Sequence, residues 1–325
     1  MIATNTCFSL IPVETEDTAS SRIRVYTLKR SLESLGMSVS MEYSMEADVL
    51  FIQTGLTEEK LDMAREAKAR GCMVVYDVDD LGSSLWYWVP RRLFFKMVEL
   101  ADIVTTDTEP RRERLIADLG IKQVEVLPDA IDYYPSGPIK LPIVESSPLR
   151  VVWFGGLWNM EPFEPYIGVL SEMRDIQIVC IVMSEALKHF QNWYPAIEFL
   201  PWSRSTFVSS LQSCHLSCLV HGDSVEASVK SNNKFVTSVS WGVPVVASRT
   251  PEYERTAREA AVAESLFTDG DELMKCVEAL RSPNARQAYM DKAQPYVWQQ
   301  YAPEVIAKQF LDIIARNSTT YDSAF

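Results

Sequence analysis

The segment KSNNKFVTSVSWGVPVVAS, residues 230–248, is the strongest indication of fold in this chain. Two lysines, Lys230 and Lys234, and two carboxamides lie in its first five residues, and an apolar pattern with helical spacing follows. A glycine and a proline then mark a tight turn before residues 243–247, which have the composition of a short buried strand. A helix N-terminus carries unpaired N–H groups and a partial positive charge. We therefore predict an anion site at the mouth of an α/β sheet, with the phosphate or diphosphate of a nucleotide as its natural ligand.

The composition is that of a globular protein large enough for two domains. Of the 325 residues, 47% are hydrophobic and 23% are charged. A net charge of −13 argues against nucleic acid as a partner and against broad attraction to anionic membranes, so a bound anion must be held locally. No apolar run is long enough for a transmembrane segment, and we find no signal peptide. Six scattered cysteines favour a reducing, cytoplasmic location.

Strand and helix patterns alternate through both halves of the chain. The expected helices of the first half are 21–36, 58–71 and 109–120, and its expected strands are 49–52, 73–76, 103–104 and 124–127. The second half has expected strands at 149–154, 176–183, 196–200, 215–220 and 243–247. This order is typical of parallel sheets with helices on both faces.

A break in this pattern divides the chain. Residues 133–149 contain four prolines and one glycine, which indicates a linker. The predicted fold class is α/β, with two Rossmann-like domains facing each other across a cleft. We place an N-terminal acceptor-binding domain at 1–135, a linker at 136–149 and a C-terminal donor-binding domain at 150–325. The last helix is a candidate for packing back on the N-terminal domain.

Several motifs recur here in the order of a known family. The first half carries ADVLFIQ (47–53), VVYDVDDL (74–81) and a long run, ELADIVTTDTEPRRERLIADLGIKQVEVLPDAID (99–132). The second half carries LRVVWFGG (149–156) and FLPWSRSTFVSSLQSCHLSCLV (199–220), followed by the segment beginning at Lys230. In this order, over nearly the whole chain, the motifs resemble glycosyltransferases of the GT-B fold, similar to the retaining family-four enzymes.

The resemblance implies a transferase that moves a sugar from a nucleotide-diphosphate sugar to an acceptor hydroxyl. The acceptor would be a saccharide, a lipid-linked molecule or a protein, with peripheral membrane contact as an option. No metal or other cofactor is implied, since cationic side chains and helix-terminal N–H groups would stabilise the leaving diphosphate. The chain departs from the family pattern at Thr237 and Val229, where relatives carry glutamates, and residues 157–168 lack the usual arginine and lysine. The resemblance therefore does not carry over to recognition of the donor ribose or to the usual cation pair.

The candidate donor-binding residues lie in the second half. They are Gly155, Gly156, Arg204, His221, Lys230, Ser231, Asn232, Asn233 and Lys234. The glycines would let the backbone approach the donor. The simpler alternatives are an ordinary strand-to-helix turn at the glycines, a solvated helix start capped by serine or asparagine at the lysines, and a surface arginine at Arg204.

The candidate acceptor-side residues lie in the first half. Asp79 and Asp80 follow an expected strand, where a carboxylate would orient a hydroxyl or act as a base. The predicted acceptor-binding residues are Arg22, Arg24, Asp77, Trp86 and Trp88. Helix capping by the aspartates and core packing by the aromatic residues are the alternatives.

Three other functions fit part of the sequence. VVYDVDDL looks like the nucleophile motif of haloacid-dehalogenase phosphatases, which would use Asp77 and Asp79 with magnesium. A nucleotide-sugar epimerase would share the architecture, and a catalytically degenerate member would bind the nucleotide sugar without turnover. A zinc site in SCHLSCLVH (213–221) is rejected, because side chains on one strand alternate between faces.

Overall fold

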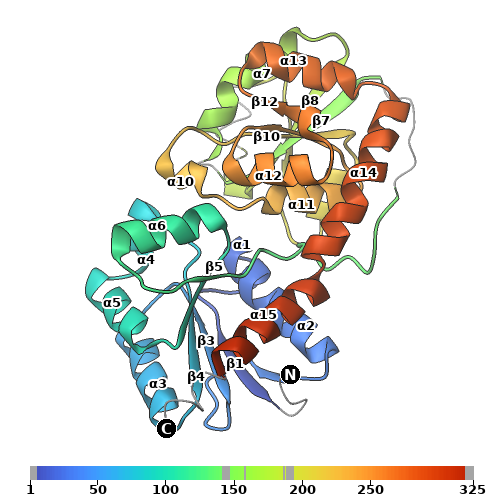
Figure 1. Ribbon diagram of the computed structural model, residues 1–325. Helices are drawn as coiled ribbons and strands as arrows, with labels where there is room; N and C mark the ends of the chain where they lie inside the picture. Colours follow the sequence, from blue (N-terminus) through green and yellow to red (C-terminus); the bar gives the residue numbers. More distant parts are fainter. Residues whose placement is uncertain (1–5, 141–146, 157–158, 186, 188–193, 319–325) are drawn as a thin grey trace. The chain divides into compact units, whose positions relative to one another are not determined.

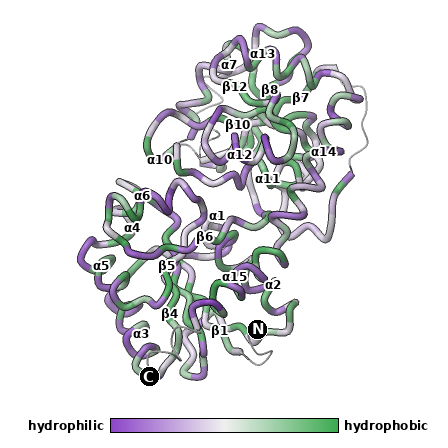
Figure 2. Tube along the Cα trace, viewed as in Figure 1, coloured by the Kyte–Doolittle hydropathy of each residue, from purple (hydrophilic) through white to green (hydrophobic). Residues whose placement is uncertain are grey.

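The computed structural model describes residues 6–140, 147–156, 159–185, 187 and 194–318. The chain forms two compact units. Unit 1 contains Met1–Asp132, Val229–Ser231 and Tyr301–Phe325, and unit 2 contains Tyr133–Ser228 and Asn232–Gln300. In each unit helices flank a central sheet, and the strands carry mostly hydrophobic residues (Figures 1 and 2).

Unit 1 is built on a parallel sheet with the order β2-β1-β3-β4-β5-β6 among the described residues. Its strands are β1 (Cys7–Ile11), β2 (Ser38–Ser40), β3 (Val49–Gln53), β4 (Met73–Asp77), β5 (Ile103–Thr106) and β6 (Glu125–Val126). Its helices are α1 (Ala19–Ser21), η1 (Arg22–Tyr26), α2 (Thr27–Ser34), α3 (Glu58–Ala69), α4 (Gly82–Trp88), α5 (Arg91–Leu100), α6 (Glu109–Leu119) and α15 (Pro303–Ser318). The sequence analysis did not predict β1 or β2.

Both faces of this sheet are buried, as expected when parallel strands have helices on both sides. Successive residues of β3 alternate between the faces. Leu50 and Ile52 pack in the core that includes residues of α3 and α5. Phe51 packs in the other core, where its ring centroid lies 5.7 Å from that of Phe310 on α15. The last helix is therefore part of the core of unit 1.

The helix predicted over residues 21–36 is interrupted. Arg22–Tyr26 form a π-helical turn between α1 and α2. The side chains of Arg22 and Arg24 are buried there and pair with distant aspartates. A π-turn adds a residue to the helical repeat and so changes which side chains face inward. Sequence periodicity does not reveal such a turn, because the aspartates that pair with Arg22 and Arg24 lie far away in the sequence.

Unit 2 is built on a second parallel sheet, with the order β12-β11-β10-β7-β8-β9 among the described residues. Its strands are β7 (Leu149–Phe154), β8 (Ile176–Val182), β9 (Glu198–Pro201), β10 (Leu216–Leu219), β11 (Val245–Ser248) and β12 (Leu266–Phe267). Counted from β7, this is the strand order of dinucleotide-binding folds. Its topological switch point lies between β7 and β10, where ligands bind beyond the carboxyl ends of the strands.

The helices of unit 2 cover the two faces of this sheet (Figure 1). They are η3 (Glu161–Phe163), α7 (Glu164–Glu172), α9 (Phe207–Gln212), α10 (Val225–Ser228), α11 (Asn233–Ser240), α12 (Pro251–Glu259), η4 (Ala263–Ser265), α13 (Gly270–Ala279) and α14 (Pro283–Tyr301). Within the described ranges, no helix of either unit has the length and apolar character needed to cross a bilayer.

Candidate functional site

The switch point of unit 2 brings several predicted donor residues to one edge of the sheet. Gly155 and Gly156 follow β7 directly, and His221 comes two residues after β10. Helix α11 precedes β11 in a parallel arrangement, so its N-terminus lies at the same carboxyl edge. Lys234 is in the first turn of α11. These residues therefore share the edge at which α/β sheets bind ligands.

Lys234 is held against the end of β7. Its Nζ lies 5.5 Å from the centroid of the Trp153 ring and 5.7 Å from that of Phe154. A Cβ atom added at Gly155 would lie 3.0 Å from Nζ and 3.0 Å from the Trp153 ring. Glycine at 155 therefore leaves room for this close approach of the ammonium group, which places a positive charge beside the switch point.

The start of α11 is fixed by a buried amide. Asn232 occupies the N-cap position, yet its side chain makes no capping hydrogen bond. Its Nδ2 instead donates to Oγ1 of Thr256 on α12 over 2.6 Å. The predicted alternative, in which an asparagine caps a solvated helix start, does not describe Asn232. Thr237 is 2% exposed and its Oγ1 lies 3.4 Å from Oδ1 of Asn233, so it does not replace a ligand-binding glutamate.

His221 and Arg204 have different surroundings. The Nε2 atom of His221 lies 3.1 Å from the hydroxyl of Tyr253, a fully buried residue whose pKa is raised by burial. The backbone N–H of His221 donates to Oγ of Ser248. These contacts fix the imidazole at the end of β10. Arg204 is exposed in the turn before α9.

The predicted run from Lys230 to Lys234 is divided between the two units. Val229, Lys230 and Ser231 belong to unit 1, whereas Asn232 begins the next segment of unit 2. Within unit 1, Oγ of Ser231 donates to Asp129 over 2.7 Å, and Thr108 donates to the carbonyl of Val229 over 3.0 Å. Val229 is buried in the core of that unit. The run is therefore not a single continuous helix start.

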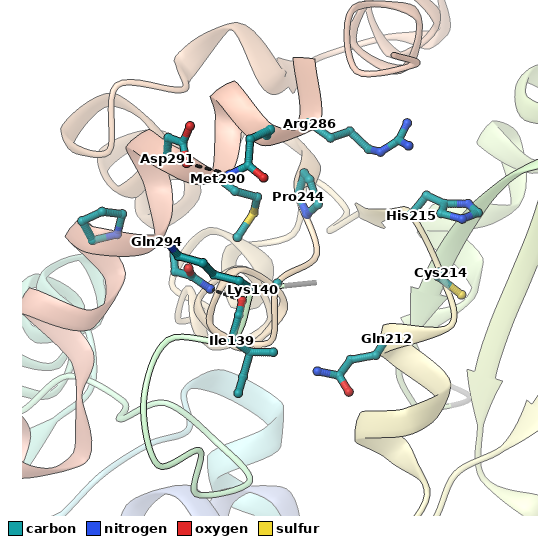
Figure 3. Close-up of a pocket in the computed structure, with 13 residues that line it drawn as sticks. Ile139, Lys140, Gln212, Cys214, His215, Pro244, Arg286, Met290, Asp291 and Gln294 are labelled. Atoms are coloured by element: carbon teal, nitrogen blue, oxygen red, sulfur yellow. Dashed lines mark hydrogen bonds between the residues drawn. The ribbon is translucent and has the colours of Figure 1, made fainter. Parts of the chain in front are cut away.

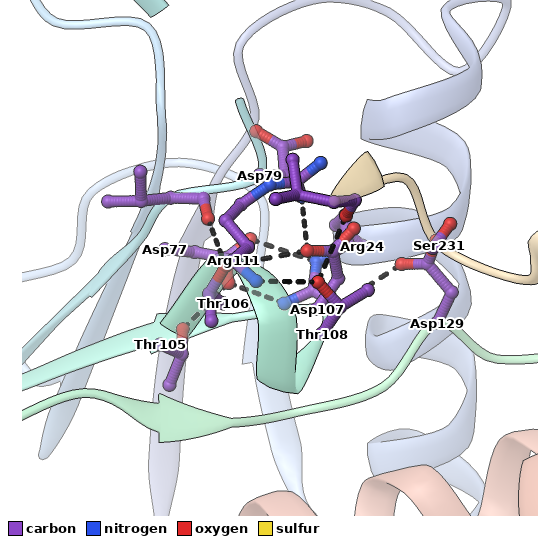
Figure 4. Close-up of polar contacts among 12 residues, drawn as sticks. Arg24, Asp77, Asp79, Thr105, Thr106, Asp107, Thr108, Arg111, Asp129 and Ser231 are labelled. Carbon is purple, nitrogen blue, oxygen red and sulfur yellow. Dashed lines mark hydrogen bonds and ion pairs between the residues drawn. The ribbon is translucent and has the colours of Figure 1, made fainter. Parts of the chain in front are cut away.

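Unit 1 has its own cluster of charges at the carboxyl edge of its sheet (Figure 4). Arg24 pairs with Asp77 and Asp129, and Arg111 pairs with Asp107. All five of these side chains are at most 8% exposed. Burial opposes the charge of Arg24, but Asp77 and Asp129 raise its pKa well above the usual value. Buried charges of this kind are tolerated because each is paired.

Asp79 lies at this edge and is oriented by two polar side chains. Its Oδ2 accepts a hydrogen bond of 3.0 Å from Nε2 of Gln53, and its Oδ1 accepts one from Oγ1 of Thr54. The backbone N–H of Asp79 also donates to Thr54. Gln53 is itself held by donors from Val13 and Ser21. Asp79 is therefore a fixed hydrogen-bond acceptor.

The carboxyl groups of Asp77, Asp80 and Asp107 at this edge have raised pKa values, each mainly because of burial. Burial, followed by the negative charge of Asp79, raises the pKa of Asp80 to about 6, although Lys230 and Arg111 oppose the shift. Burial also raises the pKa of Asp107 to about 7 against the effect of Arg111. Carboxyl groups that titrate near neutral pH can exchange protons during a reaction. Asp80 is more accessible than Asp107.

Three predicted acceptor residues are occupied by contacts within unit 1. Arg22 makes a bidentate pair with Asp132, with both N–O distances 2.9 Å. Arg24 makes a bidentate pair with Asp77, which also accepts from Oγ1 of Thr105. Asp77 is 0% exposed. These residues would have to leave their partners to touch an acceptor, and the buried, paired Asp77 is unsuited to attack a phosphate as a phosphatase nucleophile would.

The predicted aromatic site is partly a packed cluster. The ring of Trp86 contacts that of Phe94 edge to face at 5.5 Å, and the Arg91 guanidinium lies 4.5 Å from the Trp86 centroid. Tyr87 beside it is 80% exposed. The side chain of Trp88 lies outside the described part of the structure. A role of Trp86 in acceptor binding remains a prediction.

The sequence analysis did not single out Asp107, Arg111, Asp129 or Gln53. Gln53 ends β3, Asp107 and Asp129 come after β5 and β6, and Arg111 lies in the first turn of α6, so position after an expected strand was the available signal. The pairings of Arg24 could not be predicted, because they join residues more than 50 positions apart, such as Arg24 and Asp77. Among the described residues, no group of three His, Cys, Asp or Glu side chains is arranged to hold a metal ion.

Comparison with known proteins gives similarity in structure only. No family model matches the sequence, and no curated protein matches it significantly. HepE of Anabaena, solved with UDP and glucose, has a TM-score of 0.65 and 12% identity over 96% of this chain and 100% of its own. The O-GlcNAc transferase of Thermobaculum terrenum has a TM-score of 0.60 and 12% identity over 96% of this chain and 67% of its own. TarM has a TM-score of 0.61 and 9% identity over 88% of this chain, which spans only 57% of TarM. These similarities confirm the predicted α/β class and the GT-B fold of two Rossmann-like units.

Proposed function

We propose that this protein is a glycosyltransferase that moves a sugar from a nucleotide-diphosphate sugar to an acceptor hydroxyl. The observation that carries the proposal is the Lys234 ammonium beside Gly155, at the switch point of unit 2. The GT-B fold supports it, and so do the structural neighbours that were solved with UDP or UDP-glucose. A diphosphate is the ligand that a lysine and a helix N-terminus at this edge would bind.

The reaction breaks the bond between the sugar C1 and the diphosphate oxygen and forms a bond between C1 and the acceptor oxygen. Negative charge develops on the leaving diphosphate, where Lys234 and the N-terminus of α11 stabilise it without a metal ion. Unit 1 supplies the acceptor side, where Asp79 orients the hydroxyl and Asp80, with a pKa of about 6, is suited to accept its proton. We also propose that the transfer retains the configuration at the sugar C1 and that the protein is cytoplasmic.

The test is thermal-shift screening with UDP-, GDP-, ADP- and dTDP-sugars, each with and without EDTA. A nucleotide at about 100 times its Kd stabilises the folded state by about 2.7 kcal/mol, which raises Tm by several degrees. We expect one of the nucleotides to raise Tm by this amount both with and without EDTA. Lys234→Ala should remove this increase. Lys275→Ala, which changes an exposed lysine of the same unit, should retain it. The absence of any shift, or equal binding by Lys234→Ala, would count against the proposal.

One observation favours a second function. Thr237 is buried within α11 where the family resemblance expects a glutamate. The second function is that of a catalytically degenerate member, which binds a nucleotide sugar without transferring it. Mass spectrometry of a mixture of acceptors incubated with the stabilising nucleotide sugar separates the two functions. A glycosylated product supports the transferase. Binding without a product, and without hydrolysis of the donor, supports the binding protein.

A further inference from the structure

Unit 2 has a cavity at the opposite end of its sheet from the switch point. Its volume is about 270 Å³, near the lower limit of about 300 Å³ for typical ligand pockets. His215 and Pro244 line it, and they immediately precede β10 and β11 at the amino ends of these strands. Residues of α14 and the 139–140 segment complete the wall (Figure 3). This cavity is therefore separate from the predicted donor site.

Two of the residues that line the cavity carry a positive charge. Arg286 on α14 is 4% exposed, and its Nη1 donates to the carbonyls of Leu280 and Arg281. These bonds fix the guanidinium in place. Lys140 is exposed and adds a second positive charge from a different segment. The acidic member of the lining is Asp291, which accepts a hydrogen bond from Gln287.

His215 adds a neutral donor. Its Nδ1 accepts a hydrogen bond of 2.9 Å from the backbone N–H of Arg150. Because a neutral imidazole with one accepting nitrogen carries its proton on the other, Nε2 of His215 is a donor. Among the described residues, Nε2 has no hydrogen-bond partner. Burial and the charges of Arg286 and Arg150 lower the pKa of His215, which indicates a positive potential at this end of the cavity.

The rest of the wall is apolar. Ile139, Met290 and Pro295 line the cavity, and Gln294 closes one side by donating to the carbonyls of Ile139 and Val239. Apolar surface beside a cluster of donors fits a small organic molecule that carries an anionic group. A phosphate monoester has three oxygen acceptors and a charge of −1.5 to −2 at neutral pH, which matches donors that come from three segments.

We propose that this cavity binds the phosphate monoester of a small organic alcohol. Arg286, His215 and Lys140 contact the phosphate, and the apolar wall contacts the organic part. The site lies within unit 2 and does not depend on the proposed transferase function. In this acidic protein, a fixed positive charge at Arg286 and a cavity coincide here.

The probe is phenyl phosphate, with phenol as the uncharged comparison, and the readout is NMR of histidine. The chain has three histidines, His189, His215 and His221, so their signals can be assigned by substitution. His215→Asn places an amide oxygen where Nδ1 accepts from Arg150 and removes the Nε2 donor. All titrations use a Lys234→Ala background, which removes binding at the donor site.

We expect phenyl phosphate to shift the His215 signal saturably and to raise the pH midpoint of its titration, because a bound anion favours the imidazolium. Phenol should do neither. Lys140→Glu should weaken binding about ten-fold or more, the loss expected for a charge-assisted contact. Lys275→Glu, on α13 and outside the cavity, should leave the affinity unchanged. The proposal is overturned if no saturable shift occurs at His215, if phenol binds equally well, or if Lys140→Glu binds like its parent.

Discussion

Asp80 of unit 1 holds its proton at a pH where an ordinary aspartate has lost it. Its folded-state pKa is about 6, whereas an unfolded aspartate titrates near 3.9. A carboxyl pKa that is raised by folding favours the folded state fully at pH values below the pKa of the unfolded chain. This contribution to stability is lost as the pH rises through 6. The free energy of unfolding should therefore fall between pH 4 and 7 by about 2 kcal/mol on account of Asp80.

Asp80→Asn removes this ionisation. We therefore expect the free energy of unfolding of the variant to increase by about 2 kcal/mol relative to that of the parent as pH rises from 4 to 7. The measurement is urea denaturation at several pH values, followed by hydrogen exchange of β4 to report on unit 1. Asp62→Asn, at an exposed position of α3, is the control and should follow the parent. If the free energy of unfolding changes with pH in the same way in Asp80→Asn and in the parent, the pKa of Asp80 is not raised by folding.

The sequence predicted some of these residues and not their partners. Asp79 and Asp80 could be placed at a sheet edge because they follow a clear apolar strand. Asp77 was predicted from the same motif to bind an acceptor, but it is buried against Arg24. An aspartate that binds a ligand and one that neutralises a buried arginine look the same in sequence, since the difference depends on a tertiary contact.

At the scale of elements, the end of β7 and the start of α11 depend on each other. Gly155 leaves room for the Lys234 ammonium, and a Cβ at that position would meet both Nζ and the Trp153 ring at 3.0 Å. Lysine can move its flexible end, but Trp153 is 1% exposed and has little freedom. Gly155→Ala should therefore displace Lys234 and cost about 1–3 kcal/mol of stability through overpacking.

We expect Gly155→Ala to weaken binding of the stabilising nucleotide about ten-fold, because the ammonium loses its position. Gly168→Ala in α7 is the matched control, since a Cβ there meets no atom within 4 Å. An alanine within a helix should stabilise unit 2 by about 0.5–1 kcal/mol without changing affinity. Isothermal titration and urea denaturation measure the two effects. Unchanged affinity in Gly155→Ala would argue against Lys234 as a donor-binding residue.

Elements with strong patterns were predicted closely. The helix expected at 109–120 is α6 (Glu109–Leu119), followed by Gly120 in the left-handed conformation at φ 68°. The strands β1 (Cys7–Ile11) and β2 (Ser38–Ser40) were not predicted, because one is a single short run and the other is largely polar. Their place in the sheet comes from pairing with each other and with β3, which local sequence does not encode.

At the scale of the whole molecule, unit 1 is assembled from three separate stretches of chain. The sequence indicated a break near residues 133–149 but gave no sign that Val229–Ser231 belongs to unit 1, since three residues have no periodicity. The buried residues Ile306, Phe310 and Ile313 of α15 have helical spacing, which predicts a packed face. That pattern does not specify which sheet the face covers.

This assembly makes the C-terminal helix essential to unit 1. The Phe310 ring is fully buried, with centroids 5.7 Å from Phe51 and 6.1 Å from Phe8. Phe310→Ala should lower the stability of unit 1 by about 3–5 kcal/mol, the range for an aromatic side chain removed from a core. A chain that ends at residue 300 should lose the cooperative folding of unit 1. Hydrogen exchange with mass spectrometry can follow β3 for unit 1 and β10 for unit 2 in the same sample.

The control is Lys308→Ala, an exposed position on the same helix, which should change stability by less than about 0.5 kcal/mol. In Phe310→Ala we expect β3 to lose protection at lower denaturant while β10 keeps more of its protection. Because α15 supplies part of the core around β1 and β3, its loss exposes apolar surface of that core. Equal protection of β3 in Phe310→Ala and the parent would mean that unit 1 folds without the last helix.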